Sequence, residues 1–250
     1  MIEQLLVFIA SFIANTMSAF AGGGAGLVQL PALIFLGLPF PIALATHKFA
    51  TVALGVGASY RYLKEKDLID LKFAIFISVI GMLGTIVGAY IIVQIPEELA
   101  KTGLAWITIV LGLYSAFKKK FGEQYIPRNR DLKGYIIGAT ALLLIGIFNG
   151  SLTSGSGLFV TLLLIIWYGL DYKRAVAYTL VLVGFFWNAT GATTLSLLGE
   201  PVHWVWIPTL LVASLLGGYT GAHLNVSKDN KLVKLAFVSV TLLSGISLLI

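Results

Sequence analysis

The sequence contains no cysteine, and only 11% of its 250 residues are charged. The absence of cysteine excludes disulfides, thiolate catalysis and cysteine-ligated metals. A typical soluble domain carries about 25% charged residues, so the low charge argues against a water-soluble fold. The three histidines, His47, His203 and His223, lie far apart in the chain. We therefore expect no metal site and no cofactor.

Hydrophobic residues are abundant instead. They make up 58% of the chain, and the mean hydropathy is +0.94. The apolar segments run at about 2–20, 26–37, 42–60, 73–95, 100–117, 134–150, 157–169, 174–197, 203–224 and 233–250. Most of them approach the length of about 20 residues that a membrane-spanning helix needs, whereas the second and seventh are too short. This pattern predicts an all-α polytopic membrane protein.

The first apolar segment ends in Ala19-Phe20-Ala21, which resembles a signal-peptidase site. However, the residues before this segment carry no positive charge, and a signal peptide requires one. We expect the segment to remain in the mature chain.

Each short segment follows a glycine-rich break. The run Ala21–Gly26 (AGGGAG) precedes the first, and Ser151–Gly157 (SLTSGSG) precedes the second. Glycine disfavours helix and leaves its backbone exposed, and an exposed N–H in hydrocarbon must find a partner. The breaks should therefore be buried in protein or face a polar cavity, where a ligand could serve as that partner.

The two halves of the chain match each other. Gly24 and Gly26 correspond to Gly155 and Gly157 at an offset of 131 residues, and the pairs Gly84/Gly88 and Gly217/Gly221 correspond at an offset of 133. We interpret the second set as packing seams between helices, within one subunit or between subunits. The match predicts a first transmembrane repeat at 1–120, a cytoplasmic linker at 121–133 and a second repeat at 134–250. Each repeat would hold a glycine-broken helical hairpin and three transmembrane helices.

Lys and Arg gather in four clusters, which the positive-inside rule assigns to the cytoplasm. The clusters lie at 61–72, 118–133, 173–174 and 228–234. Because the broken segment 134–169 begins and ends at such clusters, it must cross the membrane an even number of times. The repeats are then inverted, with both termini outside. The alternative treats each broken segment as one kinked crossing, which places some basic clusters on the wrong side.

In the inverted arrangement both hairpin tips point to the middle of the membrane from opposite sides. The N-terminus of a helix has unpaired N–H groups and a partial positive charge, so two of them facing one cavity would hold a small anion. The alternative is that the glycines only let helices pack closely. The candidate substrate-binding residues at the tips are Gly22, Gly23, Gly24, Gly26, Thr153, Ser154, Gly155, Ser156 and Gly157.

Further candidates come from polar residues inside the apolar segments, namely Thr46, His47, Lys48, Tyr178 and Asn188. A charge inside a span is costly and usually serves a transport pathway or pairs with another group. Lys48 could instead extend to the membrane surface, since it lies near the end of its segment. His47 could carry a proton or be a hydrogen-bonded structural residue. Tyr178 and Asn188 are candidate lining residues.

Several motifs in the first half of the sequence resemble those of the sulfite exporter TauE/SafE family of membrane permeases. The resemblance rests on the run Ala21–Leu27 (AGGGAGL), Pro31, the turn Leu36–Pro39 (LGLP) and the stretch Ala43–Lys48 (ALATHK), in which His47 stands where the family usually has asparagine. Through chain length, duplication and the second break it extends over nearly the whole chain. It implies transport of sulfur-containing anions, such as sulfite or organosulfonates, across the prokaryotic cytoplasmic (inner) membrane.

We expect the protein to be a secondary transporter, with export as the favoured direction. Backbone amides of both tips and the side chain of Lys48 would hold the transported anion. No Gly-x-x-x-x-Gly-Lys-[Ser/Thr] motif is present, so the energy would come from ion gradients. The alternatives are a passive anion channel and an intramembrane enzyme, and the second has neither a Gly-x-Ser-x-Gly elbow nor a His-Glu-x-x-His motif to support it. We expect no catalytic residues. The expected partners are the anion, the bilayer and a second copy of the chain, and not nucleic acid.

Overall fold

The computed structural model describes residues 2–65, 68–92, 122–152 and 155–247, with scattered positions between 102 and 117. All regular structure in these residues is helical. Six of the helices are long and apolar enough to cross a membrane, judged by length and composition. The prediction of an all-α polytopic membrane protein is confirmed. The predicted helix at 100–117 lies almost wholly outside the described residues.

The helices follow the predicted apolar segments to within a few residues. In chain order they are α1 (Ile2–Ala21), α2 (Ala25–Phe35), α3 (Phe40–Tyr62), α4 (Leu71–Ile92), α6 (Leu132–Ser151), α7 (Ser156–Ile166), α8 (Tyr172–Val181), the π-helix η1 (Leu182–Trp187), α9 (Asn188–Leu197), α10 (Ile207–Ser227) and α11 (Asn230–Ser247). The α8, η1 and α9 segments form one continuous helical span from Tyr172 to Leu197. A π-helical turn of this kind is rare and is often found at functional sites.

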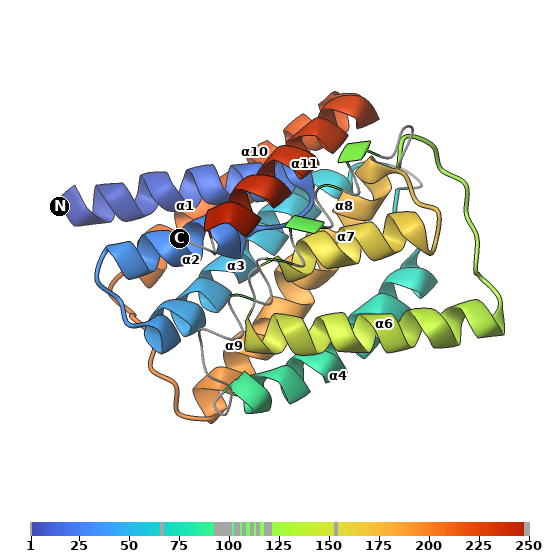
Figure 1. Cartoon of the computed structure of the whole chain (residues 1–250). Coiled ribbons are helices and arrows are strands. Elements are labelled where there is room, and N and C mark those ends of the chain that lie inside the picture. The colour runs from blue at the N-terminus through green and yellow to red at the C-terminus, as the bar shows by residue number, and fades with distance from the viewer. Residues whose placement is uncertain are drawn as a thin grey trace.

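Glycines with positive φ form both predicted breaks. Gly22, Gly23 and Gly24 have φ of +97°, +127° and +93°, and Gly155 has φ of +81°. Side chains rarely tolerate these values, so the glycines allow the chain to reverse between α1 and α2 and between α6 and α7. In Figure 1 the α1–α2 hairpin enters from the left, the α6–α7 hairpin enters from the right, and their turns meet in the middle. Each broken segment is therefore a hairpin rather than one kinked crossing.

The glycines that match between the two halves bring helices into close contact. The pairs α4–α6 and α1–α10 have the most extensive contacts between elements. A Cβ atom at Gly88 would lie 2.0 Å from the backbone oxygen of Ile147 on α6, and one at Gly221 would lie 2.3 Å from the backbone oxygen of Thr16 on α1. The interpretation of these glycines as packing seams is confirmed, and both seams lie within the chain.

Replacing Gly88 by alanine should lower the melting temperature of the purified protein. The added methyl group would force α4 away from α6, and overpacking of this kind costs about 1–3 kcal/mol. Val87 is 46% exposed on the same helix, so Val87→Ala is the matched control and should leave the melting temperature nearly unchanged. Equal melting temperatures for the two variants would show that the seam tolerates a side chain.

The described residues of the four basic clusters lie at the same end of the helices. They fall on the ends of α3 and α10 and on the beginnings of α4, α6, α8 and α11, which are the right-hand ends in Figure 1. Hydrogen bonds link these ends, because Arg61 Nε donates to His223 Nδ1 over 3.3 Å and Lys173 Nζ donates to the backbone oxygen of Val226 over 3.1 Å. The opposite end holds the loop between α2 and α3.

Candidate functional site

The turns of the two hairpins touch. A Cβ atom at Gly23 would lie 2.7 Å from the backbone nitrogen of Leu158 and 2.7 Å from the carbonyl carbon of Gly157. The hydroxyl of Thr161 on α7 donates to the backbone oxygen of Gly22 over 2.7 Å. The same hydroxyl lies 2.8 Å from that of Thr179 on α8. The first hairpin is thus attached to α7, and through Thr161 to α8.

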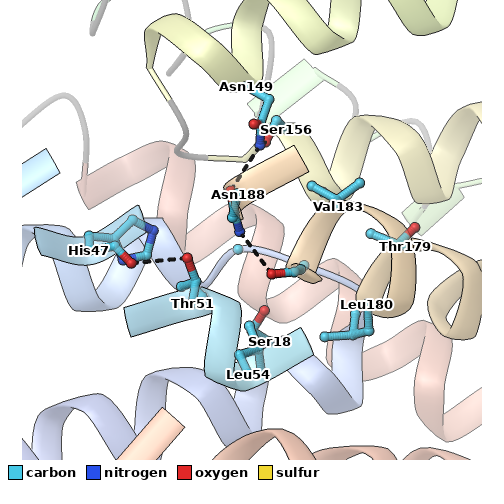
Figure 2. A pocket seen from close by; sticks show the side chains of 16 residues that line it. Ser18, His47, Thr51, Leu54, Asn149, Ser156, Thr179, Leu180, Val183 and Asn188 are labelled. Carbon is cyan, nitrogen blue, oxygen red and sulfur yellow. Dashed lines mark hydrogen bonds between the residues drawn. The ribbon is translucent and has the colours of Figure 1, made fainter. Parts of the chain in front are cut away.

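A small cavity lies beside this contact (Figure 2). Its volume is about 30 Å³, which is room for a few water molecules or a compact ion. Its polar lining consists of the side chains of Ser18, His47, Thr51, Asn149, Ser156, Thr179 and Asn188. Backbone from both hairpin turns completes it, at Gly23, Gly24, Ala25, Gly26 and Gly157. Leu54, Leu180 and Val183 form its apolar part.

Two asparagines connect the helices around the cavity. The side-chain amide of Asn149, near the end of α6, donates to Ser156 Oγ over 2.9 Å and to Asn188 Oδ1 over 3.4 Å. The amide of Asn188 in turn donates to the backbone oxygen of Gly184 in η1 over 3.5 Å. In Figure 2 Asn188 lies between Asn149 and Ser18. The second hairpin is therefore fixed to the π-helical span through side chains that line the cavity.

Lys48 is fully buried behind this asparagine pair. Its side chain has 0% exposure, and its Nζ donates to the backbone oxygen of Asn149 over 2.6 Å. Gly191 leaves the space for it, because a Cβ atom there would lie 3.0 Å from Nζ. In the described part of the chain no carboxylate forms an ion pair with it. The alternative in which Lys48 extends to the membrane surface is therefore wrong.

His47 joins the cavity to a buried polar network. Its Nδ1 lies 2.6 Å from Gln29 Oε1, and the amide of Gln29 donates to Ser11 Oγ over 2.6 Å. Ser11 Oγ is also 3.2 Å from Ser214 Oγ on α10. Because the Gln29 amide nitrogen is the donor to Ser11, its oxygen is the group that faces His47. His47 therefore has the hydrogen bond that a structural histidine requires, and it also lines the cavity.

The predicted site residues divide into four groups. Gly23, Gly24, Gly26, His47, Ser156, Gly157 and Asn188 line the cavity, whereas Gly22, Gly155 and Lys48 adjoin its lining residues. Thr46 and Tyr178 lie elsewhere: Thr46 Oγ1 accepts from the backbone N–H of His203 over 2.9 Å, and Tyr178 lines a different cavity. Thr153 and Ser154 lie outside the described residues.

Sequence reasoning did not select four of the polar lining residues, which are Ser18, Thr51, Asn149 and Thr179. Helical spacing contained a signal for two of them. Residues four apart share a helix face, so Thr51 follows His47 by one turn and Ser18 precedes Gly22 by one turn. Asn149 and Thr179 are uncharged polar residues in apolar segments, and nothing local distinguishes them from residues that only link helices.

The chain is similar to bacterial proteins that are named as membrane transporters. It is 28% identical over 229 residues to the probable membrane transporter protein of Haemophilus influenzae, covering 92% of this chain and 88% of the relative. It is 28% identical to the probable membrane transporter protein YfcA of Escherichia coli K12, and the match covers 100% of this chain and 91% of YfcA. It is 21% identical to the probable membrane transporter protein YunE of Bacillus subtilis, and the match covers 98% of this chain and 97% of YunE. No solved structure matches the chain significantly.

These relatives support a membrane transporter with a small-molecule substrate rather than an enzyme. The family model described as sulfite exporter TauE/SafE matches residues 7–248, which is nearly the whole sequence. The chain therefore belongs to the sulfite exporter TauE/SafE family.

Proposed function

We propose that the protein is a secondary transporter that moves a small sulfur-containing anion across the prokaryotic cytoplasmic membrane, with export as the favoured direction. The observation that carries the proposal is the cavity where the two hairpin turns meet. Its lining contains backbone of both turns, neutral polar side chains and, among the described residues, no acidic side chain. Membership of the family supports sulfite as the substrate.

The chemistry of the cavity favours an anion. Helices α2 and α7 begin at Ala25 and Ser156, and both residues line the cavity. The N-terminal end of a helix carries a partial positive charge, which attracts anions. Lys48 adds a buried positive charge one hydrogen bond away, through Asn149. A volume of about 30 Å³ suits sulfite better than the bulkier organosulfonates.

The arrangement of the helices supports transport by alternating access. We assign residues 1–120 and 134–250 to two inverted repeats, joined by a cytoplasmic linker at 121–133. The two hairpins enter from opposite sides (Figure 1), and the described residues of the four basic clusters lie at one end of the bundle. The positive-inside rule makes that end cytoplasmic. In this mechanism the repeats rock about the site at their interface and open it to each side in turn.

Purified protein in proteoliposomes should take up radiolabelled sulfite with saturable kinetics. Preloading the vesicles with unlabelled sulfite should accelerate the initial uptake, because a carrier exchanges substrate across the membrane. A passive channel gives no such counterflow, so its absence would favour the channel. In parallel, sulfite should raise the melting temperature of the protein more than sulfate, thiosulfate or ethanesulfonate does. No shift with any of these anions would contradict the proposed substrate class.

A further inference from the structure

A second and larger cavity lies at the basic end of the molecule. Its volume is about 300 Å³, and it is lined by Leu68, Asp70, Tyr125, Pro127, Arg130, Tyr135, Leu170, Arg174 and Tyr178. The loop that precedes α6 forms one wall and runs along the right of Figure 1. Backbone hydrogen bonds hold this loop against the chain between α7 and α8, since Ile126 N–H donates to Gly169 over 2.8 Å. The cavity is therefore built from ordered backbone of both halves of the chain.

Two arginines and one aspartate supply the charged lining of this cavity. Its acidic lining residue, Asp70, already accepts from the N–H groups of Lys72 and Phe73 over 2.8 and 3.2 Å, as the cap of α4. Of its two arginines, Arg174 forms an ion pair of 2.5 Å with Asp171. The charge of Arg130 has no such counterion among the described residues.

Two aromatic rings lie against Arg130, and its Nε has no hydrogen-bond acceptor. The centre of its guanidinium lies 3.5 Å from the ring centroid of Phe73 and 5.1 Å from that of Tyr168. At these distances the rings attract the guanidinium through cation–π contacts. Its Nε is buried without a hydrogen-bond partner. A buried donor without an acceptor is costly, so a bound oxyanion would supply what the structure lacks. Arginine is the side chain best suited to such an anion, because its donors bind two oxygens at once.

Helix α8 connects this cavity to the smaller one between the hairpins. Tyr178 lines the large cavity, and the next two residues, Thr179 and Leu180, line the small one. The hydroxyl of Tyr178 accepts from the backbone N–H of Asp70 over 2.6 Å, which ties the beginning of α4 to α8. The two cavities therefore border successive residues of the same helix, and Arg174 near the beginning of α8 places the large one at the basic end.

We propose that the large cavity is a second anion site, a cytoplasmic vestibule in which Arg130 binds the oxygens of sulfite or of a sulfonate headgroup before the anion reaches the hairpin cavity. This inference rests on the proposed function. The vestibule has room for an organic sulfonate, whereas the hairpin cavity does not. Ethanesulfonate should therefore occupy the vestibule and compete with sulfite without being transported itself.

The test compares Arg130→Gln with Arg128→Gln. Both changes remove one positive charge from the same loop, but Arg128 does not line the cavity. In vesicles assayed from the cytoplasmic side, Arg130→Gln should raise the KM for sulfite by about tenfold, the loss expected for one charged hydrogen-bond donor. The maximal rate should change little, and inhibition by ethanesulfonate should be lost. Arg128→Gln should behave as the wild type.

An unchanged KM in Arg130→Gln would overturn the proposal. An equal rise of the KM in both variants would also overturn it, because it would show only an effect of surface charge. If Arg130→Gln has a lowered melting temperature, Arg130→Lys replaces it, and its KM should still exceed that of the wild type. Calorimetric titration with ethanesulfonate separates this inference from the proposed function. Binding by the wild type that is lost in Arg130→Gln would support the vestibule even if sulfite were not transported. Equal binding by both would refute it even if sulfite were transported.

Discussion

Replacing Gly23 by alanine should abolish sulfite transport. The new methyl group would lie 2.7 Å from backbone atoms of Gly157 and Leu158 in the opposite hairpin, and backbone atoms cannot rotate away as a side chain can. The φ of +127° at this position adds strain of about 1–2 kcal/mol for any residue with a Cβ atom. The hairpin turns would therefore separate, and the cavity between them would lose its shape. Initial rates of uptake into proteoliposomes measure the effect.

Two further glycine variants distinguish contact between the turns from backbone strain. Gly37 has a φ of +103° and nothing within 4 Å of the position of a Cβ atom, so Gly37→Ala introduces strain alone. We expect it to retain most of the transport. Gly157→Ala introduces contact without positive φ, with the nearest atom, Gly23 Cα, at 3.1 Å, and its rate should be intermediate. Similar rates for Gly23→Ala and Gly37→Ala would show that the contact between the hairpins is not needed.

The positions of the helices could be predicted from the sequence because lipid imposes a simple rule. A span needs about 20 apolar residues, and a glycine-rich interruption must reverse or break the helix. This reasoning located the hairpin turns at Gly22–Gly24 and at Gly155. It also found the seam glycines, because the same spacing occurs in both halves of the chain. These features depend on local sequence and on repetition, which one sequence is enough to show.

The side-chain environment of Lys48 could not be predicted in the same way. A lysine near the end of a span reaches the surface unless other helices cover it, and the sequence of α3 does not say which helices these are. In the structure, space at Gly191 on α9 and an acceptor on α6, the backbone oxygen of Asn149, hold the ammonium group inside. Both residues are more than 100 positions away in sequence.

The sequence also does not show which side of the long helical span around Tyr178 faces the hairpins. Consecutive helical residues point in directions about 100° apart, so the side that faces the hairpins decides which residue lines which cavity. Thr179 faces the small cavity and Tyr178 the large one, opposite to the sequence-based choice of Tyr178. The π-helical turn at Leu182–Trp187 then shifts the register of the residues after it. No residue pattern in that stretch indicates such a turn.

Replacing Lys48 by methionine should reduce transport by at least about tenfold while leaving the fold intact. The ammonium group is the nearest buried cation to the cavity, reached through Asn149, and charged hydrogen bonds of this kind contribute about 1.5–3 kcal/mol. Burial of a charge is itself costly, so an apolar side chain of similar length should leave the melting temperature nearly unchanged. Sulfite uptake and thermal unfolding of the same preparation provide both measurements.

Lys48 also has a structural role that the experiment must separate from anion binding. Helix α6 ends at Ser151, so the backbone oxygen of Asn149 is among the last four carbonyls, which have no partner within the helix. Arg61→Met is the matched control, because it removes a cation from the same helix in a part-buried pair with Glu65, and its transport should stay within about twofold of the wild type. Normal uptake in Lys48→Met would contradict anion binding. If its melting temperature fell at the same time, only the capping of α6 would remain as the role of this lysine.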